Sequence, residues 1–308
     1  TYAMAPSPLS HYSPVFANKA WAENEQYRSY YVHPHWKEVE SKPKGKKQWG
    51  RKRGLYTWDV EKSLNTNLEN EAAQIYASLL AFEEPDLQAR ITWAQFLMSQ
   101  HVRTPTFMRY EKGAANLLDY QVNPDHDRVG CPECGDLACI TSREWCFLIA
   151  HEDDFFIRSD NPLLLTGFVE RPQTCLFYPL SPRVCFAACS QKDNWVAVHP
   201  DPQDLHSIWG IELAKGGAWM INFYLARGAD ESIILPPSLD GSLAETMFGD
   251  VLGKYPQPPF SLHEVARGEI EDAFESIRMI MSTIDGKNYP TWLPLELEPL
   301  SRSTYTPN

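Results

Sequence analysis

Cysteine and histidine side chains gather between positions 126 and 139, and their types suit a metal ion. Cys131 and Cys134 form a Cys-x-x-Cys turn, a spacing at which two thiolates reach one tetrahedral zinc. His126 lies five residues before this pair and Cys139 lies five residues after it. These four side chains predict a zinc ion whose coordination is complete, which would make it structural rather than catalytic.

Two alternatives to this ligand set stay open. Cys146 or His151 can take the place of one ligand, although Cys146 falls in an apolar segment that is typical of a strand. A reduced surface loop or a redox-active dithiol would need no metal. The chain has seven cysteines and shows no signal-peptide pattern, so we expect thiols or metal ligands rather than disulfides.

A second group of candidates lies on one predicted helix. Trp93, Phe96, Gln100 and Arg103 are spaced by three, four and three residues, which places them on one helix face. Because the two polar side chains continue an apolar stripe, they point inward or into a cleft. A buried guanidinium needs an anion or several acceptors, so Arg103 would hold a phosphate or carboxylate while Gln100 orients substrate or water. The alternative is that Arg103 pairs with a structural carboxylate.

Asp160 and His11 are the remaining candidates for acid–base chemistry. Asp160 lies in a polar turn, residues 158–162, directly after a predicted buried strand, where a carboxylate can serve as a metal ligand or general base. The alternative is an Asx turn in which Asp160 caps its own backbone. His11 stands alone near the N-terminus, and an isolated histidine is more often a surface or core residue than a catalytic one.

A basic segment, Lys42–Arg53, is a candidate site for phosphate groups. It holds seven Lys and Arg residues together with Gly, Pro and Trp, a composition typical of an exposed loop. Cations bind phosphates and an aromatic ring stacks on bases, which favours a nucleic-acid contact, although charge runs are commonly only solvated surface. The candidate nucleic-acid-binding residues are Lys46, Lys47, Trp49, Arg51 and Arg53.

The elements that must position these groups begin with helices. A capping box at Thr66–Glu69 predicts the start of a helix that runs past Leu79. A second helix is predicted over Pro85–Thr104 and a third from Thr106 to about Leu118. Two more helices are predicted in the C-terminal half, at about Asp204–Ala226 and Leu262–Ile284.

Strands occupy the middle of the chain. They are predicted at 145–149, 155–157, 163–166, 175–178, 184–188, 195–199 and 233–235. Helices followed by strands and then by helices indicate an α+β fold with an N-terminal helical region, a central and mostly antiparallel sheet, and C-terminal helices. We expect one globular domain over residues 1–288, a cysteine-rich excursion at about 123–141, and a polar, Pro-containing tail at 289–308.

Composition and charge limit the classes of function. The 308 residues are 43% hydrophobic, enough for a folded core. A net charge of −12 argues against binding nucleic acid or an anionic membrane with the whole surface. No apolar run approaches the length of roughly 20 residues that a membrane helix needs. We therefore expect a soluble, cytoplasmic protein with no membrane partner.

Four short motifs resemble those of an uncharacterised, mostly bacterial family classed as a domain of unknown function. They are His11–Pro14, Arg103–Pro105, Ser159–Pro162 and Pro179–Pro182, and the similarity extends over roughly residues 10–226. Val15 departs from the family pattern, which has Gln there, so a polar role for that segment is in doubt. The cysteine cluster is not part of the shared pattern. The resemblance implies that His11, Gln100, Arg103 and Asp160 converge, but it brings no known activity.

Two hypotheses for function follow, and they belong to different classes. The first is a hydrolase acting on a phosphate-bearing or nucleic-acid substrate, with His11 and Asp160 as acid–base or metal-binding groups, Gln100 positioning water and Arg103 stabilising negative charge. The second is a non-enzymatic acidic protein that binds a basic partner, such as the inhibitor of a toxin, because negative charge speeds the encounter with a cation. An adaptor held together by zinc is a further alternative.

Overall fold

A computed structural model of the chain describes residues 9–32, 39–55, 57–105, 107, 134–165, 174–189, 208–239 and 252. Several expected elements lie wholly or almost wholly outside these residues: the helices at 106–118 and 262–284, the strand at 195–199, and the tail at 289–308.

A five-stranded sheet forms the centre of the described structure, in the order β10-β5-β9-β8-β7. Only β10 and β5 are parallel among its pairs, so the expectation of a mostly antiparallel sheet is confirmed. The strands are β5 (Glu144–Ile149), β7 (Leu164–Leu165), β8 (Leu176–Pro179), β9 (Val184–Cys189) and β10 (Trp209–Glu212).

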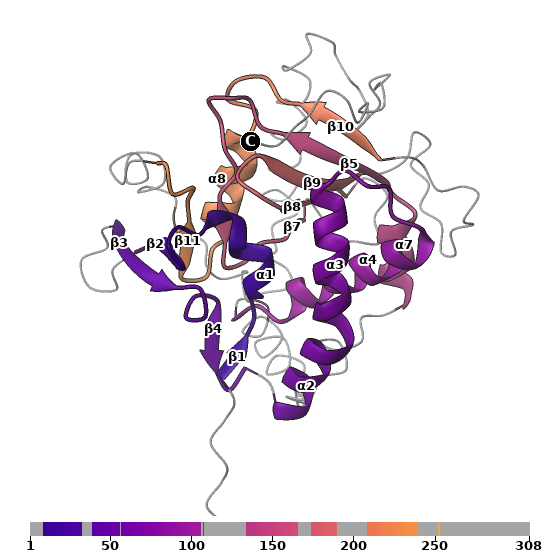
Figure 1. Cartoon of the computed structure of the whole chain (residues 1–308), viewed down its shortest axis with the longest axis horizontal. Coiled ribbons are helices and arrows are strands. Elements are labelled where there is room, and N and C mark those ends of the chain that lie inside the picture. The colour runs from indigo at the N-terminus through magenta and orange to yellow at the C-terminus, as the bar shows by residue number, and fades with distance from the viewer. Residues whose placement is uncertain are drawn as a thin grey trace, which may run out of the picture.

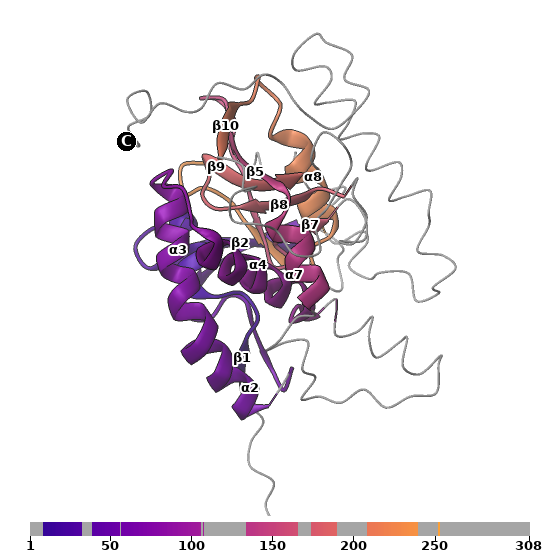
Figure 2. The same cartoon turned by 90° about the vertical axis from the view of Figure 1, so that its right-hand side faces the viewer.

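Both faces of this sheet are buried because its central strands are almost continuous runs of apolar residues. On β5, Trp145 and Phe147 point to one face, and Cys146 and Leu148 point to the other. The helices α3 (Asn70–Leu80), α4 (Leu87–Val102) and α7 (Cys134–Thr141) lie on the first side of the sheet, and α8 (Trp219–Arg227) lies on the second (Figure 2). Each face therefore has its own apolar core.

A second sheet is built from segments far apart in the sequence. Its order is β3-β2-β11-β6, and its strands are β2 (Gln26–Val32), β3 (Val39–Gly45), β6 (Arg158–Ser159) and β11 (Ser232–Ile234). A separate two-stranded ribbon pairs β1 (Leu9–His11) with β4 (Arg51–Arg53). Two short helical turns, α1 (Val15–Asn18) and η1 (Lys19–Trp21), connect β1 to β2. Figure 1 shows the ribbon next to the first long helix.

The first long helix begins earlier than the capping box predicted. It starts with α2 (Trp58–Ser63), where the Thr57 side chain accepts a hydrogen bond from the backbone N–H of Val60. It continues through a π-helical segment, η2 (Leu64–Glu69), into α3. The prediction of a helix start at Thr66 was wrong, because the Glu69 carboxylate is used in a tertiary contact described below. The second helix agrees with the prediction, and Asp86 caps it by accepting from Ala89 N at 2.8 Å.

Three other predictions need correction. The segment Lys42–Arg53 is not an open loop, because it contains most of β3 and all of β4. The helix expected from Asp204 was wrong over residues 209–218: Trp209–Glu212 form β10, and Gly216, with φ of +85°, lies in the turn before α8. Residues 155–157 are extended but form no strand, and the pairing begins at Arg158 with β6.

The fold class is α+β, as the sequence predicted. Before the helical region, the first forty-odd residues contribute β1 and two strands of the second sheet. Within the residues that the structure describes, no helix is long and apolar enough to cross a membrane.

Candidate functional site

The β1–β4 ribbon brings together two segments that the sequence suggested separately. Its register places His11 opposite Arg51, Ser10 opposite Lys52 and Leu9 opposite Arg53. After β1 the chain turns at Tyr12 and Ser13, whose backbone N–H groups both donate to the carbonyl of Gly50, at 2.9 and 3.2 Å. Gly50 has φ of +69°, and a Cβ atom there would come within 2.5 Å of Ser13 Cβ. Only glycine fits this close approach.

His11 is held by a carboxylate from the first long helix. The Nδ1 atom of His11 lies 3.5 Å from Glu61 Oε1, and the backbone N–H of His11 donates to the same oxygen at 3.4 Å. The His11 side chain is 27% exposed, whereas that of Glu61 is 11% exposed. A carboxylate in this position orients an imidazole ring and fixes which nitrogen carries the proton. The contact therefore restricts the orientation of the His11 ring.

Basic side chains border His11 on the ribbon. Residues directly opposite one another in an antiparallel pair share a face of the sheet, so Arg51 lies on the same face as His11, and Arg53 follows two residues later. Arg51 donates from Nη1 to the carbonyl of Lys47 at 2.6 Å, and among the described residues it forms no ion pair with a carboxylate. On the opposite face, Lys52 pairs with Glu231 at 3.0 Å. Arg51 is therefore a cation that can accept an anionic ligand.

Two other candidates from the basic segment have a different environment from the one expected. Trp49 is 1% exposed and its indole N–H donates to Ser232 Oγ at 2.9 Å. Its ring contacts Tyr27 edge to face. Trp49 therefore cannot stack on a base in this structure, which corrects the role given to it. Lys46 pairs with Glu25 at 2.6 Å.

Arg103 and Gln100 contact each other but both are fully buried. Arg103 donates from Nη1 to Glu69 Oε1 at 2.6 Å. When the Gln100 amide is oriented to satisfy its neighbours, its oxygen accepts from Nε and Nη2 of the same guanidinium. These contacts match the alternative in which Arg103 pairs with a structural carboxylate.

Asp160 joins two parts of the second sheet. Its carboxylate accepts three backbone hydrogen bonds, from Asp230 at 2.7 Å, Glu231 at 2.8 Å and Ser232 at 2.7 Å. Burial, followed by the nearby carboxylate of Asp230, raises the pKa of Asp160 to about 7, while the three N–H donors lower it. The side chain caps the backbone of a segment about seventy residues away, so it is not the local Asx turn considered above. Its contacts are those of a structural group.

A buried polar layer connects the motifs that carry the family resemblance. Asn18, which exchanges hydrogen bonds with Ser13, accepts from Arg158 Nε at 2.8 Å. Arg158 also donates to the Tyr178 hydroxyl at 2.5 Å and to the Pro179 carbonyl at 2.8 Å. Burial raises the pKa of Tyr178. The positive charges of Arg158 and Arg103 lower this pKa, and the negative charge of Glu69 raises it. Arg158 therefore joins the segments that contain Ser13 and Pro179 in one buried layer.

The N-terminal part of the chain matches a known family. Residues 10–127 match the model of a family described as "Protein of unknown function (DUF4238)". The resemblance to an uncharacterised family is thus confirmed for this DUF4238 region. The region contains His11, Glu61, Gln100 and Arg103, whereas Asp160 lies beyond it. No curated protein and no solved structure matches the chain.

The proposed zinc ligands lie largely outside the described residues. His126 and Cys131 belong to the part of the chain that is not described, and Cys134 is the first residue of α7. Cys139, on the same helix, is half-buried and packs against the core beside α4. Within the described ranges, no three His, Cys, Asp or Glu side chains are arranged to hold a metal ion. The zinc site remains a prediction.

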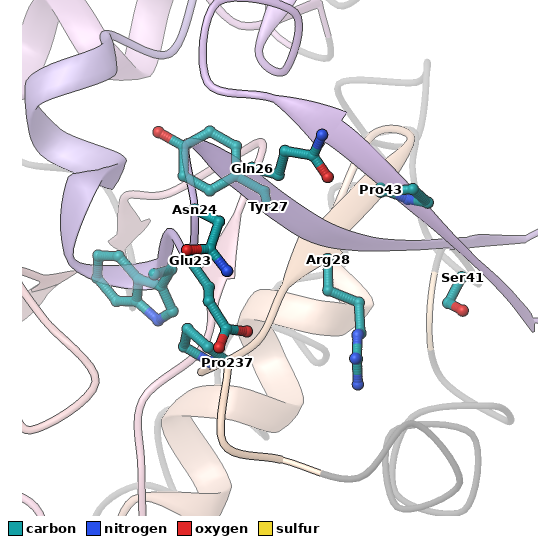
Figure 3. Close-up of a pocket in the computed structure, with 9 residues that line it drawn as sticks. Glu23, Asn24, Gln26, Tyr27, Arg28, Ser41, Pro43 and Pro237 are labelled. Carbon is teal, nitrogen blue, oxygen red and sulfur yellow. The ribbon is translucent and has the colours of Figure 1, made fainter.

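The structure also contains an open pocket of about 290 Å³ away from the ribbon, on the β2–β3 hairpin. Glu23, Arg28 and Pro237 line it, and Figure 3 shows the first two side chains extending beside one another. Arg28 donates to the carbonyl of Leu239 at 3.2 Å. None of the candidate residues from the sequence lies in this pocket.

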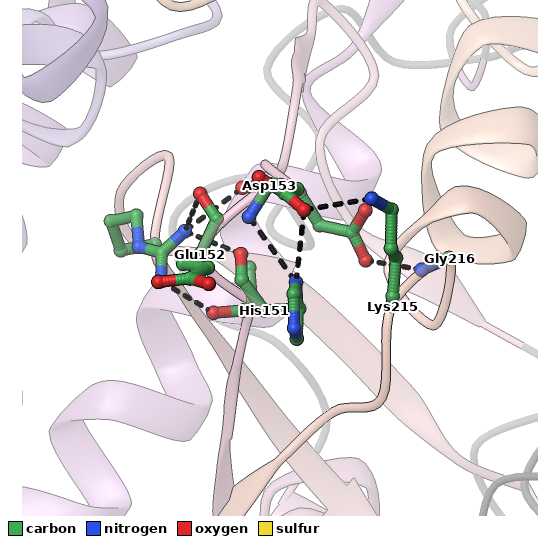
Figure 4. Close-up of polar contacts among 8 residues, drawn as sticks. His151, Glu152, Asp153, Lys215 and Gly216 are labelled. Atoms are coloured by element: carbon green, nitrogen blue, oxygen red, sulfur yellow. Dashed lines mark hydrogen bonds and ion pairs between the residues drawn. The ribbon is translucent and has the colours of Figure 1, made fainter.

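His151, the reserve zinc ligand, lies in a tightly bonded turn (Figure 4). Its Nδ1 atom accepts from the backbone N–H of Asp153 at 3.2 Å. The Arg183 guanidinium donates to carbonyls of the turn, including that of His151 at 2.5 Å and that of Ala150 at 2.6 Å. Asp153 pairs with Lys215 at 2.7 Å. These contacts fix the turn to the loop before α8.

Sequence reasoning missed Glu61 and misassigned Glu69. Glu61 carries no local motif, and only the pairing of β1 with β4 brings His11, fifty residues earlier, against it. Glu69 fitted a capping box, although it contacts Arg103 instead. The two glutamates are eight residues apart on one continuous helix, which corresponds to a rise of roughly 12 Å.

Proposed function

We propose that this protein is a hydrolase of phosphate esters, in which His11 is the general base and Arg51 binds the phosphate. One observation carries the proposal: His11 pairs with Glu61 and lies directly opposite Arg51 on the ribbon. A histidine oriented by a carboxylate and an arginine on the same face are the groups that attack on a phosphate ester requires.

The chemistry divides between these side chains. Arg51 would bind two phosphate oxygens with its planar guanidinium and stabilise the charge that develops on them. His11 would accept a proton from the attacking water as the new P–O bond forms. The P–O bond to the leaving group then breaks, the departing alkoxide takes a proton from solvent, and the protonated imidazole returns its own proton to solvent. Glu61 would hold the ring and stabilise its charged form.

Access to His11 is part of the proposal. The Nε2 atom is covered in this conformation, so the substrate must displace neighbouring groups at the ribbon before proton transfer. Catalytic contacts in a free enzyme are often incomplete and tighten only when the substrate is bound. The other candidates of the sequence hypothesis then have supporting roles: Arg103, Gln100 and Asp160 maintain the fold around the ribbon.

The test is hydrolysis of bis(4-nitrophenyl) phosphate by wild type, His11→Asn and His151→Asn. The control histidine has a similar exposure, 33%, but lies in the turn of Figure 4. We expect His11→Asn to lower kcat/KM by about a hundredfold or more and His151→Asn to leave it unchanged. Equal activity in all three proteins would overturn the assignment of His11.

A further inference from the structure

Two large apolar side chains are exposed in the described part of the chain, and they lie on β1, which carries His11, and on α2, which carries its partner Glu61. Leu9 is 37% exposed and Trp58 is 59% exposed. Leu9 lies two residues before His11 on β1, so both side chains point to the same face. Trp58 is the first residue of α2, three residues before Glu61. Figures 1 and 2 both show α2 next to β1.

Helix geometry places Trp58 on the ribbon side of α2. Successive residues advance by about 100° around a helix. Val60 and Leu64 contact the apolar core, so the direction midway between them marks the buried side of the helix. Around the helix axis, Glu61 lies about 80° from this direction, toward His11. Trp58 lies about 60° further in the same direction. An indole at this position borders the His11–Glu61 pair on its solvent side.

Cationic side chains lie on the same helix as the exposed indole and on the neighbouring ribbon. Lys62 lies one helical turn after Trp58 and is exposed, so the two side chains are neighbours on the helix surface. Arg51 and Arg53 lie on the ribbon face that includes His11. An exposed aromatic ring among cations is the combination with which proteins bind unpaired bases and the phosphates beside them. The indole is more than half exposed, so one face of the ring is open to a ligand.

We propose that Trp58 stacks on an unpaired base and that the substrate of the site is single-stranded nucleic acid. This inference rests on the proposed function, whose substrate class it specifies. The base would lie on the Trp58 ring while the adjacent phosphate reaches Arg51 and His11. Base stacking, which the sequence predicted for Trp49, is thus assigned to Trp58, nine residues later. Paired bases present no free face to the indole, so duplex DNA would be excluded.

The experiment measures binding of fluorescent oligothymidylate, an abasic strand of equal length and a duplex to the non-cleaving His11→Asn protein at low salt. Trp58→Ala and Trp58→Phe are introduced into that background. We expect Trp58→Ala to weaken oligothymidylate binding about tenfold, with little effect on the abasic strand. Trp58→Phe keeps a ring and should stay within about threefold.

The outcomes separate the two proposals. If oligothymidylate binding depends on Trp58 but wild-type protein hydrolyses neither it nor bis(4-nitrophenyl) phosphate, the stacking role of Trp58 stands as a binding function and the hydrolase proposal fails. If the small diester is hydrolysed but Trp58→Ala binds oligothymidylate as tightly as its parent, this inference is overturned alone. Equal affinity for the duplex and the single strand would also overturn it. Since Trp58 is exposed, circular dichroism of the variants should match that of the parent.

Discussion

Arg103 and Glu69 form a buried ion pair that joins the C-terminal end of α4 to the π-helical segment η2. The Nη1–Oε1 distance is 2.6 Å, and the Arg103 side chain is completely buried. Gln100 accepts from the other side of the guanidinium. The pair thus connects two helices, and the Arg103 guanidinium donates to protein groups, Glu69 and Gln100.

Arg103→Lys tests this structural role. Lysine keeps the charge but cannot donate to Glu69 and Gln100 together from a planar group, which leaves buried acceptors without partners. We expect a loss of about 2 kcal/mol in the free energy of unfolding, measured by urea denaturation. Arg53→Lys, at an exposed position, is the matched control and should change stability by less than about 0.5 kcal/mol. An unchanged midpoint for Arg103→Lys would return Arg103 to the list of substrate-binding groups.

Asp160 makes a prediction about pH. Its folded pKa of about 7 exceeds the unfolded value of about 3.9, so the folded state binds the proton more tightly. Its contribution to stability is then largest below about pH 4 and decreases as the pH rises toward 7, by at most about 4 kcal/mol. Asp160→Asn cannot ionise. We expect wild type to be more stable than Asp160→Asn, with a gap that narrows from pH 4.5 to pH 7.5. A gap that stays constant over this range would show that the folded carboxylate is already ionised at pH 4.5.

The elements that local pattern determines were predicted well. Pro85 and Asp86 predicted the start of α4. The apolar residues around Trp145 and Phe186 predicted two central strands of the sheet. In these segments the capping group and the buried side chains lie within a few residues, so the sequence window contains the physical cause.

The errors occurred where a distant residue decides the local environment. Seven cations around Trp49 suggested a solvated loop, but Ser232 and Tyr27 hold that indole in the core. His11 could not be ranked above an ordinary surface histidine, because its partner Glu61 is fifty residues away. Of the four residues expected to converge, Gln100 and Arg103 contact each other. His11 instead contacts Glu61, and Asp160 accepts from the backbone of residues 230–232.

The zinc prediction can be checked by elemental analysis of protein purified without added metal. If His126, Cys131, Cys134 and Cys139 bind zinc, about one ion per chain should be present, since four such ligands form a closed site. Cys134→Ser should lower this content, whereas Cys185→Ser, in a buried strand, should not. A content near zero together with freely titratable thiols would exclude the site.

The most direct test of the hydrolase proposal is chemical rescue of a His11→Ala variant. Removing the imidazole should lower hydrolysis of bis(4-nitrophenyl) phosphate by about a hundredfold or more. Adding free imidazole to the assay should restore part of the activity of His11→Ala, because the small base can occupy the space next to Glu61. It should leave His151→Ala, the matched control, unaffected. Hydrolysis by His11→Ala at the wild-type rate, without added imidazole, would contradict the account.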